Sequence, residues 1–186
     1  MSGGAWFAVV AVVLAIVLAA IYLSMTAGRL DRLHKRIDTS LLTLDGHLLR
    51  RSAVSLELSV AGVMDPASSV LVAEAAHEAR TASQVEDDAR ALVESNLTAA
   101  LGAALDLEDV EEIDEVPEGR ALLDELAAAC LRVELSRRFH NDAVRACRQV
   151  RRQRLVRVFR LAGHTPWPDT WEMDDAIPEG LLRRKS

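Results

Sequence analysis

Seven arginines towards the C-terminus form the densest group of side chains that could take part in binding chemistry. Apolar residues such as Leu155, Val156 and Phe159 lie between them, so the segment is both basic and amphipathic. A segment of this type can lie on an anionic membrane, bind nucleic acid or contact an acidic protein. We expect a protein-partner surface or an ordinary solvated face, formed by Arg145, Arg148, Arg151, Arg152, Arg154, Arg157 and Arg160.

The net charge of the whole chain is −6, from 22 Lys and Arg against 28 Asp and Glu. Nucleic-acid binding depends on basic charge that neutralises phosphates, so this balance argues against a nucleic-acid partner. Part of the acidic excess is one stretch that lacks the ligand register and central glycine of an EF-hand loop. We interpret it as a solvated linker, with a site for a cation or a basic partner as the alternative. It contains Asp106, Glu108, Asp109, Glu111, Glu112, Asp114, Glu115 and Glu118.

Residues that could perform catalysis or bind a metal show no recognisable pattern. The five histidines have no ligand spacing, and His77-Glu78 lacks the second histidine of a zinc-binding HExxH helix. The glycines form no phosphate-binding loop, and no serine or cysteine stands in a nucleophile motif. We therefore expect no catalytic residue, no metal and no cofactor.

The two cysteines, Cys130 and Cys147, fall within one expected helix. Along a helix they would lie about 25 Å apart, which is beyond the reach of a disulfide. Two neighbouring arginines would lower the pKa of Cys147 if it were exposed. Burial in an apolar core is the favoured interpretation for both thiols.

An apolar segment near the N-terminus predicts a transmembrane helix. From Trp6 to Leu23 the chain reads WFAVVAVVLAIVLAAIYL, without a charged residue. At about 1.5 Å per residue this segment is roughly 27 Å long, which matches the hydrocarbon core of a bilayer. Trp6 and Tyr22 lie near its ends, where aromatic rings favour the headgroup level. A cleaved signal peptide is the alternative, but the segment has no basic n-region and no good cleavage site.

Basic residues predict the orientation of this helix. The N-terminal flank has none, whereas Arg29, Arg32, Lys35 and Arg36 follow the apolar segment. Because positive residues stay on the cytoplasmic side, we expect the N-terminus outside and the rest of the chain in the cytoplasm.

The remainder of the chain has the periodicity of long amphipathic helices. Leu30, Leu33, Ile37, Leu41, Leu44 and Leu48 form one apolar stripe that continues without a breaker from the anchor to about Val60. We expect a second helix over 68–105, with Leu71, Ala75, Val85, Leu92 and Leu101 among its apolar positions, and a third over 118–161. In the third helix, Leu122, Leu126, Ala129, Val133, Val144 and Val150 are expected to face inward.

These elements predict an all-α protein, in which an N-terminal transmembrane helix continues into an antiparallel bundle of three long helices. A fourth, short helix is an alternative for the acidic stretch. The organisation expected is an N-terminal segment over 1–28, a bundle over 29–162 and an extended, partly disordered tail over 163–186. With three bundle helices, the third would lead away from the bilayer and place the arginines roughly 45 Å from it. Trp167 and Trp171 are expected to pack the tail onto the bundle, with a recognition segment as the alternative.

Two stretches resemble the LemA family of bacterial membrane proteins. The first, residues 29–51, reads RLDRLHKRIDTSLLTLDGHLLRR and ends in the basic pair Arg50-Arg51. The second, residues 123–167, contains the basic pair Arg137-Arg138, the sequence HNDAV from His140 and a hydrophobic close over 155–161. The segment SNLTAALGAAL, residues 95–105, is similar to the family's second helix. The resemblance implies a single-pass protein of the bacterial plasma membrane with its N-terminus outside and a cytoplasmic helical domain. It brings no catalytic residues.

The functional expectation is a noncatalytic scaffold or adaptor that docks protein partners at its helical bundle. Homo-oligomers are compatible with this reading. Two alternatives stay open: an accessory component of a membrane-associated enzyme system, and an exported helical domain if the N-terminal segment is cleaved.

Overall fold

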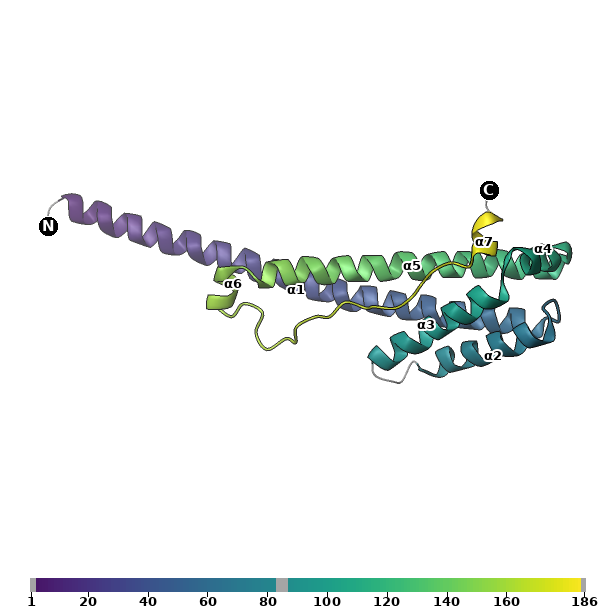
Figure 1. The fold of residues 1–186 in the computed structure, drawn as a ribbon. Helices are drawn as coiled ribbons and strands as arrows, with labels where there is room; N and C mark the ends of the chain where they lie inside the picture. Colours follow the sequence, from purple (N-terminus) through teal and green to yellow (C-terminus); the bar gives the residue numbers. More distant parts are fainter. Residues whose placement is uncertain (1–2, 83–86, 185–186) are drawn as a thin grey trace. The chain divides into compact units, whose positions relative to one another are not determined.

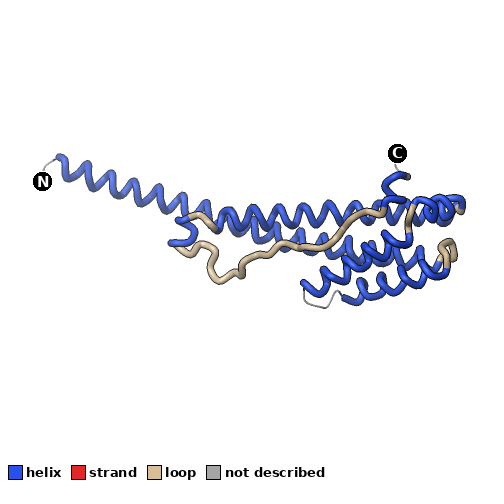
Figure 2. Tube along the Cα trace, in the orientation of Figure 1, coloured by secondary structure: helices blue, strands red, loops and turns tan. Residues whose placement is uncertain are grey.

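The computed structural model describes residues 3–82 and 87–184. All regular structure in these residues is helical, which confirms the expected all-α class (Figure 1). Figure 2 shows the helices in blue and the connecting segments in tan. The helices are α1 (Gly3–Val60), α2 (Pro66–Thr81), α3 (Asp87–Ala104), α4 (Leu107–Glu115), α5 (Pro117–Arg151), α6 (Arg154–Val158) and α7 (Glu179–Arg183).

The chain divides into two compact units, whose boundaries fall within α1, within α5 and in the segment between α6 and α7. Unit 1 contains the residues up to Thr39 and Asp142–Asp169, and unit 2 contains Ser40–Asn141 and the residues from Thr170 onward. Each unit has its own apolar core. Each is therefore described by itself.

The first helix, α1, has 58 residues and no break, as the uninterrupted leucine stripe predicts. Side chains from Trp6 to Tyr22 are exposed around the whole helix, and the first partly buried side chain is Leu23. Among the described residues, α1 is the one helix long and apolar enough to cross a membrane. The stripe that begins at Leu30 faces the cores of both units, where its members are buried or half-buried.

The core of unit 1 joins α1 to the end of α5 and to α6. Leu30 and Cys147 are almost completely buried there, with Val150 and Val156 beside them. The main core of unit 2 takes side chains from α1, α2, α3, α4, α5 and α7. Its members include Leu58, Val72, Leu97, Ile113, Leu126 and Leu181.

The single helix expected over 68–105 is wrong, because α2 ends at Thr81 and α3 begins at Asp87. The two helices pack against each other, so the chain makes one more reversal than expected. Two of the expected apolar positions are exposed instead, Leu71 by 44% and Leu92 by 63%. Val85 lies outside the described residues. No glycine or proline marks the end of α2, so the sequence contains no local signal for it.

The acidic stretch contains the short fourth helix that was considered for it. Asp106 caps α4 by accepting hydrogen bonds from the N–H groups of Glu108 and Asp109. Val110 and Ile113 turn into the core of unit 2, while the carboxylates remain on the other faces. Pro117 then starts α5, at a helical position that needs no donor N–H.

The third helix was expected to reach residue 161, but α5 ends ten residues earlier, at Arg151. Gln153 is extended, with φ −62° and ψ 137°, and α6 follows in a new direction. A straight helix would carry Val156 onward at about 1.5 Å per residue. The turn instead returns Val156 to Cys147 and Val150 in the core of unit 1, and burial of its apolar side chain compensates for the broken helix.

Part of the segment expected to be an extended, partly disordered tail is folded. Trp171 is 5% exposed and packs on Leu44, Leu48 and Val133, which confirms the expected packing for this ring. Trp167, expected to pack in the same way, is 44% exposed. Farther on, α7 places Leu181 in the main core of unit 2. The apolar side chains of this segment are ordered because they pack into the cores that the long helices form.

Gly180 allows α7 to lie directly against α4 and the Leu105–Asp106 connection that precedes it. An added Cβ would meet the carbonyl oxygens of Leu105 and Asp106 at overlapping distance. We expect Gly180→Ala to destabilise unit 2 by about 1–3 kcal/mol, because α7 must move away and loosen Leu181. The measurement is the urea midpoint of the full-length protein in detergent micelles, followed by circular dichroism.

The matched control is Gly102→Ala in α3, where an added Cβ meets nothing within 4 Å. Alanine is a better helix former than glycine by about 1 kcal/mol, so this variant should be as stable as the parent or more so. Equal midpoints for the two variants would contradict the close approach of α7.

Candidate functional site

Three of the seven arginines are bound within unit 1. Arg148 donates from Nε to the Pro168 carbonyl at 2.7 Å and pairs with Asp169. Arg151 donates to the Thr165 carbonyl at 2.8 Å and lies over the Trp167 ring, 5.0 Å from its centroid. Arg145 pairs with Asp142 one turn before it. Arg148 and Arg151 hold the chain after α6 against the end of α5, whereas Arg145 pairs within α5 itself.

The other four arginines, Arg152, Arg154, Arg157 and Arg160, are exposed and make no ion pair with the described residues. Exposed apolar side chains accompany them. Val158 is 73% exposed and Phe159 is 54% exposed. The structure therefore divides the expected surface into a part that folds unit 1 and a part that is free to bind.

The two units have opposite charge. Unit 1 contains eleven Lys and Arg but four Asp and Glu, which gives a net charge of +7. Unit 2 has eleven Lys and Arg and 24 Asp and Glu, a net charge of −13. The chain's overall −6 thus conceals a strongly basic unit attached to the apolar segment.

The expectation that the arginines lie far from the anchor is wrong within unit 1. A groove of about 250 Å³ is lined by Tyr22 and Met25 of α1 together with Val150 and Gln153 at the end of α5. Arg29 and Arg32 line the same groove. The extra reversal between α2 and α3 is the reason, because it makes α5 run back towards the start of α1 instead of away from it.

Cys147 does not provide a reactive thiol. It is fully buried, and this burial raises its pKa above the ordinary value despite the nearby Arg151. Burial likewise raises the pKa of Cys130, against the opposing effect of Arg51. Both thiols are free, which confirms the expectation of buried apolar cysteines without an intrachain disulfide.

The most unusual feature of unit 2 is a buried ion pair between α1 and α3. Arg51 and Glu94 are 2% and 1% exposed, and Arg51 Nη2 lies 2.8 Å from the Glu94 carboxylate. The same nitrogen donates to the Glu94 carbonyl at 3.0 Å, and Nη1 donates to the Thr98 hydroxyl at 3.0 Å. A charge-assisted bond in such surroundings fixes the rotation of the two helices about their axes.

The network continues into the C-terminal segment. The Thr98 hydroxyl donates to the Asp174 carbonyl at 2.8 Å. Arg137 donates two hydrogen bonds to the Asp175 carboxylate, at 2.7 and 2.9 Å, and the side-chain amide of Asn141 exchanges two bonds with the backbone of Trp171. Bidentate bonds of this kind give geometric specificity, so they determine the register of the segment on α3 and α5.

Ser40 and His140 form a hydroxyl–imidazole contact of 3.0 Å between α1 and α5. This pairing is one step of a nucleophile–base arrangement. However, His140 is 3% exposed and lies within the helix packing of unit 2. The pair connects two helices and does not face a cavity among those found in the described residues.

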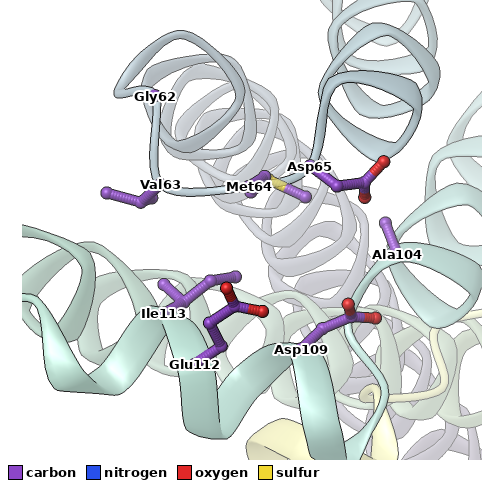
Figure 3. Close-up of a pocket in the computed structure, with 8 residues that line it drawn as sticks. All are labelled: Gly62, Val63, Met64, Asp65, Ala104, Asp109, Glu112 and Ile113. Carbon is purple, nitrogen blue, oxygen red and sulfur yellow. The ribbon is translucent and has the colours of Figure 1, made fainter.

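An acidic pocket lies between the α1–α2 connection, the end of α3 and α4. Its volume is about 220 Å³, and Figure 3 shows Asp65, Asp109 and Glu112 gathered around one space with Met64 and Ile113 beside it. Hydrogen bonds from the Ser68 side chain and backbone, and from the Ala67 backbone, lower the pKa of Asp65, which caps α2. Desolvation and the charges of Asp106 and Asp65 raise the pKa of Asp109. Among residues 3–82 and 87–184, no group of three or more His, Cys, Asp or Glu is placed to hold a metal ion.

A shallow apolar groove runs between α2 and α3, with a volume of about 370 Å³. Alanines line its floor, Leu71 lies at one side, and Glu74 and Glu78 stand along α2. This α2–α3 groove is lined by Leu71, Glu74, Ala75, Glu78, Asn96, Ala99, Ala100 and Ala103. Sequence reasoning missed the groove because it treated 68–105 as a single helix.

The sequence matches no protein-family model, no curated protein and no solved structure. The resemblance to the LemA family therefore stays a prediction.

Replacing Glu94 with Leu tests the buried ion pair. The variant leaves the Arg51 guanidinium in the core without a counter-charge, so we expect a loss of about 3–5 kcal/mol in the free energy of unfolding. The double variant Arg51→Met/Glu94→Leu removes both charges and should lose clearly less. Urea unfolding of the full-length protein in micelles measures both. A double variant that is no more stable than the single one would show that the buried charge is not the cause.

Asp109→Asn tests the acidic pocket by its pH dependence. The pKa of Asp109 is raised in the folded protein, so ionising it costs stability as the pH rises above the ordinary value for an aspartate. The variant should therefore be more stable than the parent at neutral pH, and the difference should vanish once the pH falls below that ordinary value. Glu111→Gln, on an exposed face of α4, is the control. A pH-independent difference in the urea midpoint would contradict the assignment.

Proposed function

We propose that this chain is a single-pass membrane protein whose helical domain serves as a noncatalytic scaffold for protein partners. The observation that carries the proposal is the exposed apolar part of α1, from Trp6 to Tyr22. In water, an exposed apolar surface of this length would be strongly unfavourable, at about 25 cal/mol for each Å². A bilayer solvates the side chains, and the helix satisfies its own backbone hydrogen bonds.

The proposed topology has the N-terminus outside and both units in the cytoplasm of a bacterium. Arg29, Arg32, Lys35 and Arg36 support it, since they follow the span directly. The net charge of +7 on unit 1 adds to the same asymmetry. The resemblance to the LemA family agrees with a plasma-membrane location.

The proposed scaffold is an antiparallel helical bundle. The packing of α2 on α3 and the shared core of unit 2 support this arrangement. The buried pair of Arg51 and Glu94 supports a rigid bundle. If α1 or α3 slid along its axis, a buried charge would lose its counter-ion. A rigid surface loses little conformational entropy when a partner binds.

We place the main protein-docking surface in the α2–α3 groove. Its alanine floor can accept an apolar helix face, and Glu74 and Glu78 would attract basic residues along the edge of that helix. The net charge of −13 on unit 2 would speed the approach of such a partner. The partner we expect is therefore a basic amphipathic helix.

A photo-crosslinking residue in place of Ala99 tests this surface in native membranes. Ala99 is exposed in the groove, so a docked helix should form a covalent adduct. We expect the adduct to be several-fold weaker in Glu74→Gln/Glu78→Gln, because two attractive charges are lost. The adduct is detected on blots of the membrane fraction and identified by mass spectrometry.

Glu111→Gln/Glu115→Gln is the matched control, since both glutamates are exposed on α4 outside the groove. An adduct that responds equally to both double variants would contradict docking at α2 and α3. Intact-mass measurement of the membrane-bound protein tests retention of the anchor. Loss of roughly the first 27 residues would instead support an exported domain.

A further inference from the structure

We propose that the chain after α5 docks onto the anionic phospholipid headgroups of the same bilayer that α1 spans. The inference rests on the proposed membrane anchor and assigns a lipid-binding role to arginines that make no ion pair within the described part of the chain. The headgroup surface comprises Arg29, Arg32, Arg152, Arg154, Arg157, Arg160, Val158 and Phe159, all in unit 1.

The chain after α5 begins beside the end of the exposed apolar part of α1. The exposed apolar part of α1 ends at Tyr22, and Leu23 is the first partly buried side chain after it. At this level the end of α5 meets α1, because Val150 and Gln153 line one groove with Tyr22 and Met25. Aromatic rings at the end of a span lie among the headgroups. The segment that follows Gln153 therefore begins at the membrane surface.

Unit 1 contains far more basic than acidic side chains. The acidic side chains Asp142 and Asp169 already pair with Arg145 and Arg148, so they do not neutralise the arginines of α6. Two further aspartates, Asp31 and Asp38, lie on α1, and the unit still retains a net charge of +7. A basic residue near an anionic leaflet strengthens binding about fivefold, so four such residues form a substantial electrostatic site.

Exposed apolar side chains accompany the arginines of this surface. Val158 and Phe159 are 73% and 54% exposed although they adjoin the core residue Val156. A groove lined by Arg154, Arg157 and Val158 places basic and apolar groups side by side. This combination suits the boundary between headgroups and acyl chains, where arginines reach phosphates and apolar groups enter the lipid. Nucleic acid offers phosphates without the apolar layer.

The test uses the full-length protein with Val158→Cys, labelled with an environment-sensitive fluorophore. Cys130 and Cys147 are buried, so the label reacts at the new site. The protein is reconstituted into vesicles of phosphatidylcholine alone or mixed with phosphatidylglycerol. We expect blue-shifted, stronger emission in the anionic vesicles and its loss at high salt. In Arg154→Gln/Arg157→Gln the ratio of docked to undocked segment should fall about thirtyfold.

The matched control is Arg80→Gln/Arg132→Gln, which removes two exposed arginines from unit 2 and should leave the emission unchanged. A protein that floats with both kinds of vesicle while the label stays in water would overturn the headgroup site and leave the anchor intact. Equal emission in neutral and anionic vesicles would overturn it as well, as would a response to added double-stranded DNA without one to anionic lipid. Failure to float with either vesicle would instead remove the anchor on which the inference rests.

Discussion

The guanidinium of Arg51 imposes the constraint on which the architecture of unit 2 depends. A charge withdrawn from water must be matched almost completely, and here a carboxylate, a carbonyl and a hydroxyl from α3 match it. The Thr98 hydroxyl that accepts from Arg51 also donates to the C-terminal segment, so one buried charge orders three parts of the chain. Apolar packing alone would permit small rotations of the helices, but these bonds do not.

Hydrogen bonding of buried polar groups also positions the C-terminal segment. Between α6 and α7 the chain has little helical structure, and yet its backbone groups find partners in Asn141, Ser95 and Thr98. Trp171 adds an apolar side chain that fills the space between α1 and α5 within unit 2. A segment without its own regular structure is thus held by side chains of the long helices, as an added strand would be held by a sheet edge.

The number of helices decides whether the arginines at the end of α5 lie near the apolar span of α1. Because 68–105 forms two helices, α5 runs back towards the anchor, and Val150 near its end lines one groove with Tyr22 and Arg29. If 68–105 formed a single helix, α5 would instead run away from the anchor and carry the same arginines with it. The basic end of α5 therefore belongs to the same unit as the apolar span, and that unit has a net charge of +7.

Several expectations from the sequence were accurate because they depend on local physics. An uninterrupted apolar stripe with Leu44 and Leu48 requires one face of a helix to be buried, wherever the helix lies. The inward positions of α5, including Leu126 and Val133, follow from the same periodicity.

Other features could not be deduced, since they depend on partners distant in the sequence. The ends of α2 and α5 carry no glycine or proline, and the core that Val156 shares with Leu30 after the break is formed by residues far apart in the sequence. Arg51 resembled an ordinary surface arginine until Glu94 and Thr98 were brought to it. The sequence by itself determined the helical class, the apolar span and the buried faces, because backbone hydrogen bonding and hydrophobic periodicity are local. Only the tertiary structure decided which arginines are consumed in folding and which face outward, because a charge is neutralised by whatever the fold places beside it.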